Sequence, residues 1–290
     1  MIDHNQSPDE PVTVVLPTVA PVPALFDSPH SGSTYPDDFD AAIDFMKLRR
    51  MEDAFVDELY AAAPGFGAQL IAARFPRGYI DANRAVDDID PAEIDGWSGP
   101  TKPTEKSRVG KGLIWTRLHG LEPLYARTLT GTEVQNRIDK YWMPYHAAVA
   151  AAMDDLHARF GCVYHIDCHS MRAKGNAFDP DGEATRPDFV VSNHDGKSCS
   201  AEFIDLVVAH LRGGGYGVSV NDPYKGAELT RRYADPAAGR HSLQIEISRA
   251  LYMDEMAIEK NAGYDALHAH LTDLSRVVSA FAAAQGKAVA

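Results

Sequence analysis

The sequence predicts a three-layer α/β fold, with helices on both faces of a largely parallel or mixed central sheet. Short runs rich in Val, Ile, Leu and Phe alternate along the chain with longer segments of helical periodicity. Runs that are apolar at nearly every position are typical of strands buried on both faces. An alternating order of strands and helices favours helices packed on a single sheet.

The individual elements follow from these two patterns. The predicted strands cover residues 23–27, 69–75, 113–116, 162–167, 188–192, 217–220 and 243–247. Apolar residues at helical spacing, such as Ile43, Leu48 and Leu59, predict the helices between them. The predicted helices cover residues 41–62, 201–211, 255–284, and 123–160 as one long helix or two joined near Pro144.

The chain is organised around one predicted sheet. Two connectors rich in glycine and proline, at residues 96–112 and 175–187, are predicted to be long loops over a site. The strands that flank them can all join one sheet, so we expect residues 21–290 to form a single domain. Residues 1–20 begin with a polar, acidic segment that lacks the features of a signal peptide, and we expect them to form a loose N-terminal tail.

Composition excludes several classes of partner. The 290 residues carry a formal net charge of −13, which argues against nucleic acid as a partner and requires that any anionic substrate meet locally placed arginines. No apolar run approaches the roughly 20 residues that a membrane span needs. The three cysteines are odd in number and form no CxxC motif, which favours a reduced cytoplasmic protein.

Polar residues gather directly after several predicted strands. They form the segments DSPHSG (27–32), DCHSM (167–171), NDPYKG (221–226) and IEISR (245–249). In open α/β sheets, ligands bind beyond the carboxyl ends of the strands, so these segments are candidates for one shared site.

His30 and His169 each lie in one of these segments, so both side chains can reach the same edge of the sheet. Two imidazoles and a carboxylate are a frequent catalytic zinc shell. The alternative is that each histidine is a structural residue in the core or at the sheet edge, with its hydrogen bonds satisfied by neighbouring groups. Asp167 precedes His169 by two residues and points to the same side of a strand, where it can orient the imidazole or cap a loop. Cys168 faces the opposite way and is a poor catalytic partner for His169.

Glu246 alternates with two isoleucines inside an apolar strand. It either pairs with an arginine such as Arg249 or acts as a general base beside a metal. Upstream, Arg77, Asn83 and Arg84 cluster in and before the segment YIDANRAVDD. Arginine binds carboxylates bidentately, so this cluster can hold an anionic substrate, or it forms surface salt bridges with the neighbouring aspartates.

Six motifs between about residues 25 and 250 resemble those of the N-formylglutamate amidohydrolase (deformylase) family. They are FDSPHSG, RGYIDANR, GLIWTR, HIDCHSM, NDPYKG and LQIEISR. This family is similar in fold to zinc carboxypeptidases and aspartoacylase, so the resemblance implies a zinc-exopeptidase-like version of the three-layer fold.

The resemblance implies a zinc site in this chain. His30 and His169 are implied to be the first and last ligands of one Zn²⁺ per chain, with other divalent metals as alternatives. The implied middle ligand is Asp53, and Glu52 is its competitor, because only one of two adjacent helix residues can face the site. The alternative for Asp53 is a solvated helix face.

The resemblance also implies the residues that act on the substrate. In the relatives an Asn–Arg pair binds the substrate carboxylate and a glutamate on a late strand activates the zinc water. These roles fall to Asn83 and Arg84, with Arg77 beside them, and to Glu246. The candidates for a second substrate carboxylate are Arg77, Lys225, Arg231 and Arg232.

We therefore expect a zinc-dependent amidohydrolase that cleaves N-formyl-L-glutamate, a small anionic N-acyl amino acid, to formate and L-glutamate. One alternative is a metallohydrolase for another N-acyl amino acid or a peptide C-terminus. The other is a metal-free protein that binds a dicarboxylate. The resemblance also suggests a role in histidine degradation.

Overall fold

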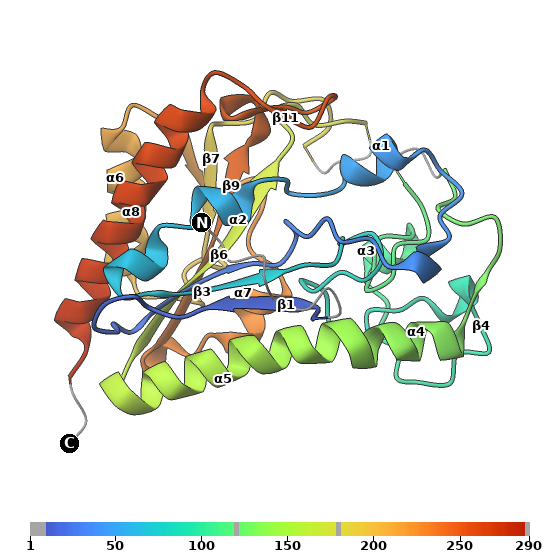
Figure 1. The fold of residues 1–290 in the computed structure, drawn as a ribbon, viewed down its shortest axis with the longest axis horizontal. Helices are drawn as coiled ribbons and strands as arrows, with labels where there is room; N and C mark the ends of the chain where they lie inside the picture. Colours follow the sequence, from blue (N-terminus) through green and yellow to red (C-terminus); the bar gives the residue numbers. More distant parts are fainter. Residues whose placement is uncertain (1–9, 119–121, 178–180, 288–290) are drawn as a thin grey trace.

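The centre of the protein is a seven-stranded mixed sheet (Figure 1). This computed structural model describes residues 10–118, 122–177 and 181–287. The strand order is β1-β3-β2-β6-β9-β7-β8, with β1 antiparallel to β3, β7 antiparallel to β9, and the remaining neighbours parallel. The strands are β1 (Val12–Val15), β2 (Ala24–Ser28), β3 (Gln69–Ala73), β6 (Val163–Met171), β7 (Phe189–Ser192), β8 (Val218–Val220) and β9 (Arg240–Ser248).

Helices cover both faces of the sheet, which confirms the predicted three-layer class. On one face α6 and α8 pack side by side with α2, and on the other lies the long α5 (Figure 1). The α-helices are α1 (Phe45–Arg49), α2 (Val56–Leu59), α3 (Glu105–Arg108), α4 (Gly131–Arg137), α5 (Met143–Phe160), α6 (Ala201–Gly213), α7 (Glu228–Tyr233) and α8 (Tyr264–Gln285). No helix in the described part of the chain combines the length and apolar character needed to span a membrane.

Shorter elements complete the fold. A π-helix, η5 (Ile138–Trp142), joins α4 to α5. Two small two-stranded sheets pair β4 (Ile94–Asp95) with β5 (Leu129–Thr130) and β10 (Met253–Asp254) with β11 (Glu259–Lys260). The 3₁₀ turns are η1 (Asp37–Phe39), η2 (Ala63–Phe66), η3 (Pro91–Glu93), η6 (Pro236–Ala238) and η7 (Arg249–Leu251).

Six of the seven predicted strands correspond to β2, β3, β6, β7, β8 and β9. The strand predicted at residues 113–116 is wrong: residues 113–115 are buried and Thr116 is half-buried, but the segment forms a bend and a bridge between Lys111 and Trp115. A short apolar run signals burial, and burial alone does not distinguish a strand from a buried loop. Within the segment expected to be a loose tail, residues 12–15 instead form the edge strand β1. Residues 1–9 lie outside the described residues, and the single domain for 21–290 stays a prediction.

The predicted helix at residues 41–62 is broken into α1 and α2. The chain between them turns, and Phe55 adopts a left-handed conformation with φ of 67°. The helix predicted at 123–160 is continuous from residue 131, where Thr130 and Glu133 form a capping box. It passes through η5 just before Pro144, whose missing N–H favours a wider turn there. The helix predicted at 255–284 begins later, at Tyr264.

Candidate active site

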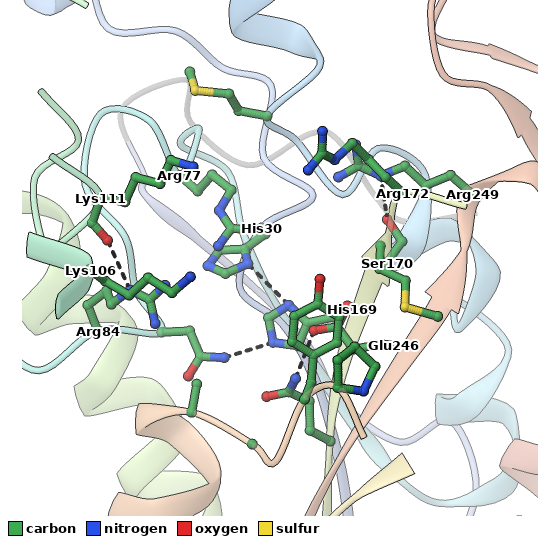
Figure 2. A pocket seen from close by; sticks show the side chains of 18 of the residues that line it. His30, Arg77, Arg84, Lys106, Lys111, His169, Ser170, Arg172, Glu246 and Arg249 are labelled. Carbon is green, nitrogen blue, oxygen red and sulfur yellow. Dashed lines mark hydrogen bonds between the residues drawn. The ribbon is translucent and has the colours of Figure 1, made fainter. Parts of the chain in front are cut away.

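Three side chains from distant parts of the chain meet at the carboxyl edge of the sheet. His30 Nδ1 lies 3.1 Å from His169 Nδ1, and Asp53 Oδ2 lies 3.0 Å from His169 Nδ1 and 3.4 Å from His30 Nδ1. All three residues are at most 3% exposed. The structure thus brings together the three residues that the resemblance implied as metal ligands, and Figure 2 shows His30 and His169 facing each other. Their role as ligands stays a prediction.

Each of the three comes from a different kind of element. His30 follows β2 by two residues, and His169 lies near the end of β6, the strand beside β2. Asp53 lies in the turn between α1 and α2, and its backbone N–H donates to the His30 carbonyl at 2.9 Å. The break in the predicted helix is therefore what brings this carboxylate to the imidazoles.

The competitor Glu52 faces elsewhere. Its carboxylate accepts a hydrogen bond from the Tyr35 hydroxyl at 2.6 Å and forms an ion pair with Arg49 at 3.1 Å. Between the two acidic neighbours, the structure places Asp53 and not Glu52 against the histidines.

A second carboxylate lies close to the remote nitrogen of each imidazole. His30 Nε2 lies 2.6 Å from Asp81 Oδ1, and His169 Nε2 lies 2.7 Å from Asp167 Oδ1. The Asn83 amide donates to Asp167 Oδ2 at 3.0 Å. The Asn83 amide nitrogen also lies 2.8 Å from His169 Nε2, so this ring nitrogen contacts both Asn83 and Asp167. The Nδ1 atom of each ring points to the centre of the cluster, and a carboxylate near the remote nitrogen is common in metal-binding histidines.

Two arginines lie behind these carboxylates. Arg249 donates to Asp53 Oδ1 at 2.9 Å, while Arg77 lies 3.7 Å from the same oxygen and donates to Asp81 Oδ2 at 3.1 Å. Burial alone would raise the pKa of Asp53, but its contacts with the two histidines and Arg77 hold that pKa well below the ordinary value. Asp53 is therefore ionised near neutral pH.

Glu246 stands directly beside His169. The two residues are opposite each other in the parallel pairing of β6 with β9, and Gln244 donates to Glu246 Oε1 at 2.8 Å. Burial raises the pKa of Glu246, and the charges of Asp53 and Asp167 act in the same direction. The suggested partner Arg249 is bound to Asp53 instead, so the strand carboxylate is left facing the pocket.

The cluster opens into a pocket of about 440 Å³. Glu246 is the one carboxylate residue among its described lining residues. The described cationic residues that line it are Arg50, Arg77, Arg84, Lys106, Lys111, Arg172, Arg186, Lys225 and Arg249. In a protein with a net charge of −13, this concentration of positive charge favours an anionic ligand. Figure 2 shows Arg77, Arg84, Lys106 and Lys111 on one side of the histidines and Arg172 and Arg249 on the other.

The predicted substrate binders occupy different positions around this pocket. Arg84 donates through Nε to the Lys111 carbonyl at 3.3 Å, and its side chain is 22% exposed. Asn83 is 3% exposed and also accepts a hydrogen bond from the Leu229 backbone N–H at 2.8 Å. Arg77 contacts the buried carboxylates described above. All three line the pocket, and their binding roles stay predictions.

The residues predicted to bind a second substrate carboxylate differ in whether they line the pocket. Arg231 and Arg232 form ion pairs with Glu228 and do not line the described pocket. Lys225 lines the pocket and pairs with Asp195 at 2.9 Å. Position therefore favours Lys225 over the two arginines of α7.

Sequence reasoning did not single out Asp81, Gln244 or Trp115 as site residues. Asp81 binds His30 and also accepts from the indole N–H of Trp115 at 3.2 Å. In the sequence, Asp81 could have been found from its position two residues before Asn83, but only the fold shows that this loop reaches His30. A mixed α/β sheet whose edge holds a buried His–Asp–His cluster, a neighbouring glutamate and a cationic pocket has the features of a hydrolase for anionic substrates.

Comparison with known proteins identifies the family. The sequence model of the N-formylglutamate amidohydrolase family matches residues 22–253, so the chain belongs to this family and the resemblance found in its motifs is confirmed. It is 31% identical over 241 residues to N-formylglutamate deformylase from Pseudomonas putida, covering 81% of this chain and 83% of that protein. The Pseudomonas aeruginosa deformylase is 30% identical over 244 residues, with 81% and 84% covered.

A solved structure is similar over nearly the whole chain. The N-formylglutamate amidohydrolase from Ralstonia eutropha JMP134 is 45% identical and matches with a TM-score of 0.89. The match covers 93% of this chain and 98% of that one.

Proposed function

We propose that this protein is a metal-dependent amidohydrolase that cleaves N-formyl-L-glutamate to formate and L-glutamate. The observation that carries the proposal is the buried cluster of His30, Asp53 and His169, which lies beside Glu246 at the base of a cationic pocket. The relatives named as N-formylglutamate deformylases support the substrate. Predictions of a cytoplasmic location and of a role in histidine degradation stay predictions.

The three residues fit a zinc ion in spacing. A tetrahedral zinc with bonds of about 2.0 Å to nitrogen and oxygen separates its ligand atoms by about 3.3 Å. The separations among the two Nδ1 atoms and Asp53 Oδ2 are 3.0, 3.1 and 3.4 Å. Three protein ligands would leave the fourth position open, as catalytic zinc sites require.

The same residues fit a divalent cation in charge. Among the described residues at the cluster, four buried carboxylates stand against three arginines. The carboxylates are Asp53, Asp81, Asp167 and Glu246, and the arginines are Arg77, Arg84 and Arg249. With both histidines neutral, as metal ligands are, negative charge remains in excess in a buried site. Uncompensated buried charge is costly, and a bound cation would offset it.

A bound zinc would supply Lewis acidity that polarises the formyl carbonyl and makes water more acidic. Glu246 accepts the proton as the water oxygen bonds to the formyl carbon, since burial raises its pKa and makes it a stronger base than an ordinary carboxylate. It then gives this proton to the amide nitrogen as the C–N bond breaks. The products are formate and the free amino group of glutamate.

The cationic pocket holds and orients the substrate in this proposal. The Arg84 guanidinium binds one substrate carboxylate, with Asn83 and Arg77 beside it, and Lys225 is the best-placed predicted candidate for the second. Holding both carboxylates would fix the formyl group over the cluster, which lowers the entropic part of the barrier.

The test is formate release by the purified protein from a panel of three substrates. We expect turnover of N-formyl-L-glutamate, and much less of N-acetyl-L-glutamate and N-formyl-L-methionine. Faster turnover of either comparison compound would replace the substrate assignment. Tight binding of glutamate with no turnover and no metal would support the metal-free binding protein instead.

A further inference from the structure

Arg249 connects the segments that carry two of the proposed metal ligands. It is the first residue of η7, directly after β9, and its side chain is 7% exposed. Nη2 donates to Asp53 Oδ1 at 2.9 Å, Nη1 donates to the Arg50 carbonyl at 3.0 Å, and Nε donates to Ser170 Oγ at 3.1 Å. Ser170 is the neighbour of His169 in β6, and Figure 2 shows its contact with Arg249.

These contacts determine which oxygen of Asp53 meets the histidines. Oδ1 is bound by Arg249, with Arg77 at 3.7 Å, whereas Oδ2 lies 3.0 Å from His169 Nδ1. A carboxylate without such a partner can rotate about its Cβ–Cγ bond and present either oxygen or both. The guanidinium therefore favours a single orientation.

We infer that Arg249 is a positioning residue, whose guanidinium holds Asp53 so that Oδ2 alone is presented to the metal. The inference rests on the proposed function. It goes further by assigning the selection of the ligand atom to an arginine that does not itself touch the metal. The fork of the guanidinium binds the turn that carries Asp53 and the strand that carries His169 at the same time. A lysine keeps the charge but has a single nitrogen and cannot reproduce this fork.

A different role for Arg249 predicts a different result. The residue also lines the pocket, so it could instead bind a substrate carboxylate. Its loss would then raise KM and leave metal affinity unchanged. The positioning role predicts weaker metal binding in the absence of any substrate.

The test measures the zinc dissociation constant of the apoprotein by competition with a chromophoric chelator. We expect Arg249→Gln to weaken binding about 10–100-fold, as loss of residues that orient metal ligands commonly does. Arg249→Lys should remain at least about 10-fold weaker than the wild type. In the Co²⁺-loaded proteins, both variants should change the visible absorption band, since the oxygen donors around the ion change. Thermal unfolding checks that each variant is folded, and if Arg249→Gln does not fold, Arg249→Lys decides the test.

Arg137→Gln is the matched control, since Arg137 is also buried but donates to the Tyr79 carbonyl and the Tyr125 hydroxyl. It should lower the unfolding temperature and keep the wild-type zinc affinity. The inference is overturned if Arg249→Gln keeps wild-type zinc affinity, if Arg249→Lys restores it fully, or if Arg137→Gln weakens it equally. If the wild type binds no metal, the proposed function fails and this inference fails with it. If the wild type and Arg249→Gln bind metal equally, only this inference fails.

Discussion

Replacing Glu246 with glutamine separates proton transfer from metal binding. The substitution keeps the shape of the side chain and its place opposite His169, but it removes the basic oxygen. General acid–base catalysis by a side chain typically contributes about 10²–10⁴-fold to the rate. This corresponds to about 3–5 kcal/mol in the activation barrier.

The structure places the expected loss in the upper part of this range. Asp53, Asp81 and Asp167 are each held by an imidazole or an arginine, and Glu246 is the one carboxylate residue among the described residues that line the pocket. No described neighbour is therefore placed to take over as base. We expect kcat to fall about 10³–10⁴-fold while zinc content stays near one per chain.

The assay combines steady-state formate release with metal analysis of the same preparation. Glu133→Gln is the control, since Glu133 caps α4 and does not line the described pocket. A kcat within a few-fold of the wild type for Glu246→Gln would remove Glu246 from the mechanism. Loss of zinc together with activity would instead make Glu246 part of the metal site.

Three further predictions concern metal binding, substrate binding and the dependence of stability on pH. Asp81→Asn should weaken zinc binding about 10–100-fold, because His30 loses the carboxylate that orients its ring, and unchanged affinity in a chelator competition would contradict this role. Arg84→Ala should chiefly raise KM for N-formyl-L-glutamate in steady-state assays, and an unchanged KM with reduced kcat would show that it does not bind the substrate. Burial lowers the pKa of His146 to about 4, so the unfolded chain takes up a proton between pH 6.5 and 4 that the native protein does not. The native state should therefore lose on the order of 3 kcal/mol over this window relative to His146→Gln, and denaturant titrations at both pH values would refute this if the difference stayed constant.

The sequence predicted that His30 and His169 lie at the same edge of the sheet, because the direction of side chains along a strand depends only on residue order. The period of two in β6 places Asp167 beside His169 and turns Cys168 to the opposite face, where it joins the apolar core. The ends of neighbouring parallel strands meet at one edge, which brings His30 and Glu246 to the same place. These features follow from residue order alone.

The remaining parts of the site depend on tertiary contacts. Asp53 reaches the histidines because the chain leaves the helix between α1 and α2, and the helical periodicity of residues 41–62 does not reveal this break. The pairing of Asp81 with His30 joins residues 51 positions apart through an irregular loop. Arg249 resembled a partner for Glu246 by proximity in sequence, yet its side chain crosses to Asp53. Which residues contact one another at these positions depends on tertiary packing, which the periodicity of the sequence does not encode.

We expect hydrolysis of N-formyl-L-glutamate by this protein to depend on a metal held by His30, Asp53 and His169. The most direct measurement is formate release before chelation, after complete metal removal, and after addition of one equivalent of zinc, in the wild type and in His169→Ala. We predict that chelation abolishes activity of the wild type, that zinc restores it, and that His169→Ala stays inactive and binds no zinc. Full activity in the chelated wild type, or zinc-restored activity in His169→Ala, would show that hydrolysis does not depend on a metal at this site.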